Sequence, residues 1–120
     1  MDKRKLSEKE RLEYRKKAKL VFRERADYFA SSMGLSFNRI AIREQRTRWG
    51  SCSSKKNLNF NWKLLLAPPQ VLDYVVVHEL CHLKQMNHSK AFWTEVEAVL
   101  PDYKERKRWL RENGAGLMNI

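Results

Sequence analysis

Residues 68–83, PPQVLDYVVVHELCHL, contain an apolar segment that the rest of the fold has to cover. Pro68 and Pro69 suit the start of a helix, because proline in a first turn lacks only an N–H that has no helical partner. The residues that follow leave almost no polar face, which is typical of a helix buried on nearly every side. The sequence therefore predicts a central buried helix in a chain of 120 residues, the size of one domain.

This segment also begins a cluster that holds every histidine of the chain, His78, His82 and His88. His78 and His82 are four positions apart, so in a helix they project from one face, one turn apart. That spacing lets two imidazoles reach a single zinc ion, with Glu79 in the general-base position of the H-E-x-x-H pattern. His88 supplies a third ligand if the chain turns back at Asn87, which leaves the fourth position open as in catalytic zinc sites.

The alternative interpretation is that these histidines are ordinary hydrogen-bonded core residues. Two imidazoles and an unpaired glutamate would be costly to bury in an apolar helix, and a metal ion removes that cost. Rival third ligands are Glu95 and Glu97, which could instead orient an imidazole. Cys81 is interpreted as a small core residue, and Cys52 is expected to pack as well, with a position facing the metal or a substrate as its alternative.

The N-terminal third predicts one long amphipathic helix. Ser7 and Glu10 have the spacing of a capping box, and apolar residues then recur at intervals of three and four up to Met33. Gly34 follows as a helix stop. We expect a charged N-terminal helix over residues 1–33 that packs on the domain.

The remainder predicts a small sheet and further helices. Residues 37–45 alternate as a strand does, and the segments that flank the turn at 53–57 predict a hairpin, so we expect an antiparallel sheet of about three strands. Ser89 is expected to cap a third helix, and a short last helix spans residues 103–112. The fold class is therefore α+β, with a main domain over residues 34–113 and a loose tail over 114–120.

Charge and composition limit the partners. The chain carries a formal net charge of +11, and residues 34–70 contain seven basic residues and one acidic residue. Such a surface attracts polyanions, including nucleic acid, or acidic substrates, or merely keeps a protein soluble. Two cysteines, a charged N-terminus and apolar runs too short to span a bilayer predict a cytoplasmic protein without a membrane segment.

Several motifs together resemble the YgjP-like metallopeptidase family, small soluble zincins related to the SprT and WLM-type metalloproteases. They are R-T-R-W-G-S-C-S, N-F-N-W, L-A-P-P and H-E-L-C-H-L-K-Q-M-N-H-S-x-x-F-W, and the match runs from about Arg46 to Trp109. The resemblance implies a zincin-like fold with a small antiparallel sheet beside the metal-bearing helix. It also implies that His78, His82 and His88 are zinc ligands and that Glu79 is the catalytic base.

The expected function is zinc-dependent hydrolysis of peptide bonds in a peptide or protein substrate, with a zinc-activated water and Glu79 as base. Candidates for oxyanion or substrate contacts are Arg46, Arg48, Tyr74 and Tyr103. The hairpin edge could hold an extended peptide by strand addition. One alternative is a zinc hydrolase of nucleotides or phosphoesters, although no phosphate-binding glycine motif is present. The other is a basic nucleic-acid-associated module in which zinc is structural.

Overall fold

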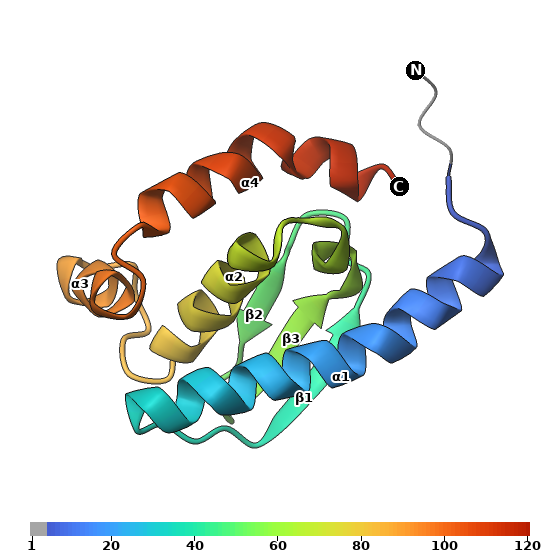
Figure 1. The fold of residues 1–120 in the computed structure, drawn as a ribbon. Helices are drawn as coiled ribbons and strands as arrows, with labels where there is room; N and C mark the ends of the chain where they lie inside the picture. The colour runs from blue at the N-terminus through green and yellow to red at the C-terminus, as the bar shows by residue number, and fades with distance from the viewer. Residues whose placement is uncertain (1–4) are drawn as a thin grey trace.

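The computed structural model describes residues 5–120 as four α-helices, one 3-10 helix and a three-stranded sheet (Figure 1). The elements are α1 (Glu8–Met33), β1 (Arg39–Arg43), β2 (Gly50–Cys52), β3 (Asn57–Asn61), η1 (Trp62–Leu66), α2 (Pro69–Cys81), α3 (Lys90–Val99) and α4 (Tyr103–Met118). The predicted α+β class is confirmed.

α1 begins and ends at the residues that the sequence indicated. The Ser7 hydroxyl accepts a hydrogen bond from the Glu10 N–H at 3.1 Å, and the Glu10 carboxylate accepts one from the Ser7 N–H at 2.9 Å. At the other end Gly34 adopts a left-handed conformation with φ 68°, which glycine reaches without a steric penalty. The expected helix over 1–33 thus begins at Glu8, and residues 1–4 lie outside the described part of the chain.

The sheet is mixed, so the expectation of an antiparallel sheet is wrong for one strand. Its order is β1-β3-β2, with β2 and β3 forming the predicted antiparallel hairpin. β1 runs parallel to β3 and pairs Ile40 with Leu58 and Ile42 with Phe60. Residues 44–49 reverse the chain direction and cross the width of one strand, so β3 enters between β1 and β2. It is then antiparallel to β2 and parallel to β1, and β2 is left as an edge strand.

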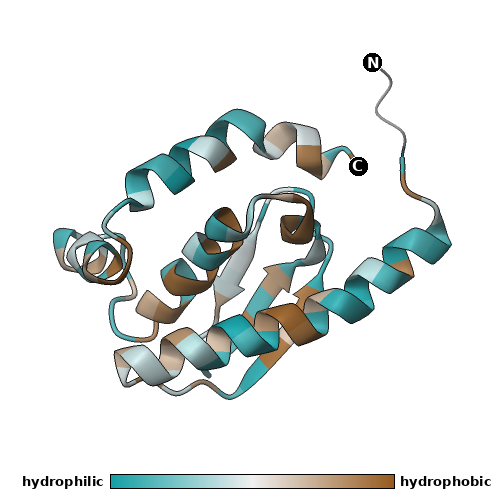
Figure 2. Cartoon of the chain, in the orientation of Figure 1, coloured by the Kyte–Doolittle hydropathy of each residue, from teal (hydrophilic) through white to brown (hydrophobic). Residues whose placement is uncertain are grey.

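α2 lies at the centre of the molecule, as the apolar segment predicted. It contacts α1, α3, α4, η1, β2 and β3, and Val76, Val77 and Leu80 have no exposed surface. Figure 2 shows hydrophobic residues on α2 and on part of α1, whereas the ribbon of α4 is mostly hydrophilic. Burial from all these directions fixes the rotation of α2 about its axis, and therefore the direction in which its polar residues point.

α4 is longer than the sequence indicated and includes residues 114–118, where a loose tail was the expectation. Asn113, Gly114 and Gly116 are poor helix formers, but tertiary contacts hold the segment. Gly114 is buried against the Trp49 ring, and the Lys63 ammonium donates to the Met118 carbonyl at 2.8 Å. Tertiary contacts of this kind are not visible in local propensity.

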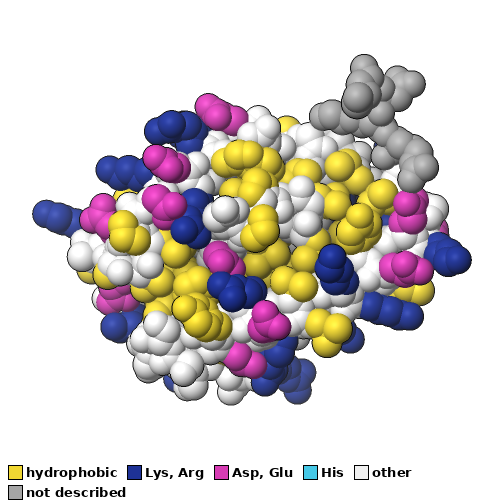
Figure 3. Space-filling model, in the orientation of Figure 1, with side chains coloured by type: hydrophobic (Ala, Val, Ile, Leu, Met, Phe, Trp, Pro, Cys, Tyr) yellow, Lys and Arg dark blue, Asp and Glu magenta, His cyan; other side chains and the backbone are white. Residues whose placement is uncertain are grey.

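The surface in Figure 3 carries Lys and Arg side chains intermixed with Asp and Glu, and hydrophobic side chains gather between α1 and α4. The net charge of +11 therefore does not form one uniform basic surface on this face. None of the helices in residues 5–120 combines the length and apolarity needed to cross a membrane.

Candidate metal centre

The three histidines come from the end of α2 and from the segment that follows it. His78 lies in the last turn of α2, and His82 is its C-cap residue with helical dihedral angles (φ −66°, ψ −16°). The four-residue spacing therefore retains helical geometry up to His82. The chain then turns back through residues 83–88, and the Ser89 hydroxyl caps α3 by accepting a hydrogen bond from the Phe92 N–H at 3.3 Å.

The Nε2 atoms of the three imidazoles converge on one point. His88 Nε2 lies 3.0 Å from His82 Nε2 and 3.2 Å from His78 Nε2. Nitrogen ligands at about 2.05 Å from a tetrahedral zinc ion are about 3.3 Å from one another. The observed separations match that arrangement closely, and this is the one group of three potential metal ligands found among residues 5–120.

The other ring nitrogens of α2's two histidines have partners that favour this use of Nε2. His82 Nδ1 lies 3.1 Å from the Gln85 carbonyl, which only accepts hydrogen bonds, so Nδ1 carries the proton and Nε2 keeps its lone pair. His78 Nδ1 lies 3.4 Å from the Tyr74 hydroxyl. These contacts orient both rings toward a shared ligand.

Two aromatic residues at the start of α3 fix the imidazole rings. Phe92 has no exposed surface, and its ring centroid lies 4.6 Å from that of His82 and 4.9 Å from those of His78 and His88. Trp93 stacks on the His88 ring, with the two ring centroids 5.8 Å apart. The F-W pair belongs to the motif noted in the sequence, but spacing alone did not indicate this packing role.

The surroundings favour the neutral form of His78 and His88. Burial, followed by the charges of His82 and His88, lowers the pKa of His78 to about 3. Burial and the neighbouring His82 and Lys107 also lower the pKa of His88. Imidazole binds a metal ion in its neutral form, so little proton competition opposes binding at neutral pH. The donor set and its protonation therefore fit a zinc ion.

Glu79 is buried beside the histidines, with 6% of its surface exposed. Burial raises the pKa of its carboxyl to about 7, and the positive charge of Arg48 opposes part of that rise. Gly50 on β2 makes room for this side chain, because a Cβ there would lie 3.1 Å from Glu79 Cγ and from the Asn59 carbonyl oxygen. Spacing alone did not indicate this role of Gly50, although Gly50 belongs to the motif R-T-R-W-G-S-C-S.

A cavity of about 460 Å³ opens beside the histidines and Glu79, between α2, the segment after it and the β2–β3 hairpin. Besides these four residues its lining comprises Arg48, Gly50, Ser51, Cys52, Ser53, Ser54, Lys56, Leu83 and Met86. Two of the residues singled out from the sequence, Arg48 and Cys52, thus lie at this cavity. The edge strand β2 forms part of its wall.

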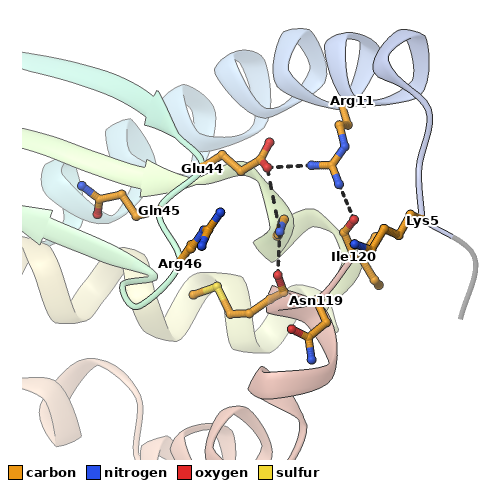
Figure 4. A pocket seen from close by; sticks show the side chains of 9 residues that line it. Lys5, Arg11, Glu44, Gln45, Arg46, Asn119 and Ile120 are labelled. Atoms are coloured by element: carbon orange, nitrogen blue, oxygen red, sulfur yellow. Dashed lines mark hydrogen bonds and ion pairs between the residues drawn. The ribbon is translucent and has the colours of Figure 1, made fainter.

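The other expected oxyanion contacts lie elsewhere. Tyr74 is buried with its hydroxyl against His78 Nδ1, on the side of the ring away from Nε2, and Tyr103 stacks on Trp93 with ring centroids 5.4 Å apart. Neither lines the cavity. Arg46 lines a separate pocket, whose wall also includes Lys5 and Glu44 (Figure 4).

The rival ligands are not part of the cluster. Glu95 pairs with Lys84 at 3.3 Å and lines a different pocket, and Glu97 is exposed. Cys81 is fully buried, and burial raises the pKa of its thiol to about 12. Cys52 lines the cavity, but burial and the charge of Glu79 raise its pKa to about 11, so it is a neutral thiol.

Two solved structures that share this fold are metallopeptidase zymogens. The zymogen of abylysin from Pyrococcus abyssi aligns with a TM-score of 0.67 and 24% identity, over 76% of this chain and 93% of that one. The zymogen of jannalysin from Methanocaldococcus jannaschii aligns with a TM-score of 0.67 and 23% identity, over 77% of this chain and 95% of that one. The fold is therefore that of the zincin-like metallopeptidases.

The amino-acid sequence matches a known protein family over most of its length. A model of the YgjP-like metallopeptidase domain matches residues 2–113, and the chain belongs to the YgjP-like metallopeptidase family. The resemblance drawn from the motifs is thereby confirmed. The matched range includes α1 as well as the sheet and the histidine cluster. A search of curated proteins finds no match.

Proposed function

We propose that this protein is a zinc-dependent metallopeptidase in which His78, His82 and His88 hold the metal and Glu79 is the general base. The observation that carries the proposal is the convergence of three Nε2 atoms, 3.0 and 3.2 Å apart, beside a buried carboxyl group. Membership of a metallopeptidase family supports peptide-bond hydrolysis as the reaction.

Glu79 is suited to moving protons during hydrolysis. A bound zinc ion would supply Lewis-acid activation of water and of the substrate carbonyl. Glu79 accepts the proton of the attacking water and delivers it to the departing amine. In the metal-free protein burial raises the pKa of this carboxyl to about 7, and a general acid–base catalyst works best when its pKa is close to the working pH.

The substrate has a natural binding surface on β2. Among residues 5–120 the side of this strand away from β3 has no strand partner, and Gly50 to Cys52 line the cavity. An extended peptide that pairs with β2 would pass across the histidine cluster. Arg48 lies two residues before this strand, lines the same cavity and is close enough to affect Glu79, so it is placed to stabilise the developing oxyanion.

The test compares peptide and nucleotide hydrolysis by the wild type and Glu79→Gln. We expect the zinc-loaded wild type to cleave casein-type peptides, and Glu79→Gln to lose at least about 100-fold in rate with its zinc content unchanged. Triphosphate turnover that depends on Glu79, without peptide cleavage, would instead support a hydrolase of phosphate compounds. Nucleic-acid binding that survives the substitution, without hydrolysis of either substrate, would support a structural zinc.

A further inference from the structure

The cavity beside the histidines is lined by more basic than acidic side chains. Apart from the histidines, its charged lining residues are Arg48, Lys56 and Glu79. Glu79 is buried beside the metal ligands, and Arg48 lines the same cavity. Lys56 is different, because within residues 5–120 no carboxylate forms an ion pair with it.

Lys56 projects from a turn that the fold holds firmly. Its backbone adopts a left-handed conformation with φ 64°, uncommon for a residue with a side chain. Its N–H donates to the Ser53 carbonyl at 3.0 Å, and its carbonyl accepts from the Asn38 N–H at 2.8 Å. The Ser53 hydroxyl also accepts a bond from the Asn57 N–H at 3.2 Å. The position of the Lys56 backbone relative to β2 is therefore set by the scaffold.

Lys56 and Arg48 lie beyond opposite ends of β2. The strand spans Gly50–Cys52, and an extended peptide beside it advances about 3.3 Å per residue. Gly50, the first residue of β2, lies against Glu79, because a Cβ there would be 3.1 Å from Glu79 Cγ. The Arg48 end of β2 is therefore the closer to the reacting bond, and Lys56 faces a substrate residue farther along. The apolar side chains of Leu83 and Met86 line the same cavity, with Met86 78% exposed.

The wider surroundings of the metal centre also carry positive charge. Lys107 on α4 adds a third cation near the centre, beside the aromatic residue that packs on His88. Its ammonium group lies 4.2 Å from the centroid of the Trp93 ring, which stacks on His88. A negatively charged ligand is attracted to this region, and a positively charged one is repelled.

We propose that the enzyme prefers acidic peptides, and that Lys56 determines this preference by pairing with an aspartate or glutamate side chain of the substrate. This inference rests on the proposed peptidase function and names the substrate class for the same site. The pair would form at the cavity wall, one or more residues from the bond that is cleaved. Lys56 is thus a specificity residue and takes no part in the proton transfers.

The test uses peptides that differ in a single side chain. Starting from one cleaved peptide, each position flanking the scissile bond is occupied in turn by Glu, Gln or Lys, and kcat/KM is measured for every peptide. We expect one position at which Glu is favoured over Gln by a factor of about five, the effect of a partly exposed ion pair worth about 1 kcal/mol. Lys56→Gln should abolish this preference and leave kcat/KM for the Gln peptide within about twofold of the wild type.

Lys55→Gln is the matched control, because it removes the same charge from the neighbouring exposed residue, which does not line the cavity. It should retain the preference, whereas Lys56→Glu should reverse it in favour of the Lys peptide. Peptide cleavage without a Glu preference, or with one that Lys56→Gln leaves intact, overturns the inference and leaves the peptidase standing. No peptide cleavage at all, by a zinc-loaded wild type, overturns both.

Discussion

At the scale of single residues, burial decides the protonation of the candidate centre. Glu79 has 6% of its surface exposed, and this burial raises the pKa of its carboxyl, while burial lowers that of His78. Both shifts favour the uncharged form, as expected where water is excluded. A zinc ion would reverse part of this effect, because it attracts the glutamate charge and takes up the imidazole lone pairs.

The raised pKa of Glu79 predicts a pH-dependent stability of the metal-free protein. Its folded value is about 7 against an ordinary value of 4.5, so the folded state holds the proton more tightly. The stability of the wild type relative to Glu79→Gln should be highest below pH 4.5 and fall by up to about 3 kcal/mol as the pH rises through 7. Urea denaturation of both proteins without metal measures this, and a difference independent of pH would contradict it.

Gly50 predicts a steric effect on the same carboxyl group. In Gly50→Ala the new Cβ would lie 3.1 Å from Glu79 Cγ and from the Asn59 carbonyl, which is too close without movement. We expect a loss of about 1–3 kcal/mol in the free energy of unfolding, as for other overpacked sites, together with reduced peptide hydrolysis. Gly114→Ala is the control, because its Cβ would meet Trp49 at an ordinary 3.4 Å. Equal stability of Gly50→Ala and the wild type would refute this account.

At the scale of elements, the start of α3 holds the histidine cluster in place. The Ser89 hydroxyl caps this helix, and Phe92 in its first turn packs against the histidine rings. His88 precedes the cap directly. The position of the third candidate ligand therefore depends on where α3 begins.

Ser89→Ala should consequently weaken both the fold and metal binding. Loss of an N-cap hydroxyl costs about 1 kcal/mol, and fraying of the first turn would loosen Phe92 and His88. We expect a lower melting temperature and a higher dissociation constant for zinc, measured by calorimetry. Thr94→Ala removes a hydroxyl from an exposed site within the same helix, where it donates to the Lys90 carbonyl, and should change zinc affinity little. Similar zinc affinities for the two variants would count against the role of the cap.

A second junction links α1, the end of β1 and η1 through Glu44. Its carboxylate accepts hydrogen bonds from Arg11 at 2.6 Å and from Trp62 Nε1 at 2.8 Å. Burial alone would raise the pKa of Glu44, but the hydrogen bonds from Trp62 and Arg11 and the charges of Arg11 and Lys63 lower it overall. These contacts therefore stabilise the fold while Glu44 is ionised.

Glu44→Gln should lower the melting temperature at neutral pH, because the ion pairs with Arg11 and Lys63 are lost. A lowered folded pKa means that this contribution is present above the ordinary value of 4.5 and disappears as the pH falls below it. The melting temperatures of the wild type and the variant should therefore converge in acid. Scanning calorimetry from pH 7 down to about 3 checks this, and curves that stay parallel would contradict it.

Local sequence signals predicted the elements better than their arrangement. Ser7, Gly34 and Ser89 mark helix ends through hydrogen bonds with near neighbours, so their roles are visible in sequence. The parallel pairing of β1 depends on where β3 inserts, and the continuation of α4 past residue 113 depends on Trp49 and Lys63. Contacts between distant segments leave no local pattern.

The same division holds within the candidate site. The spacing of His78, Glu79 and His82 is a helical pattern, and the structure brings these residues together with His88 as that pattern indicated. Spacing could not show that Gly50 faces Glu79 across the cavity. It also could not show that the Tyr74 hydroxyl contacts His78 Nδ1, on the side of the ring away from the cavity.

At the scale of the whole molecule, the histidine cluster joins the central helix to the C-terminal half of the chain. His78 and His82 belong to the end of α2, which most other elements contact, and His88 belongs to the segment that leads into α3. A metal held by all three would tie these parts together. A ligand that binds only the folded state adds about 2.7 kcal/mol to the free energy of unfolding when its free concentration is 100 times its dissociation constant.

The most direct test of this account is the X-ray absorption spectrum of the protein loaded with zinc at neutral pH. We predict one zinc per chain, with three imidazole nitrogens at about 2.0–2.1 Å, one oxygen ligand that is not from the protein, and no sulfur. In His88→Ala one imidazole should be missing from the spectrum. A sulfur ligand at about 2.3 Å, or a nitrogen shell unchanged in His88→Ala, would contradict the proposed metal centre.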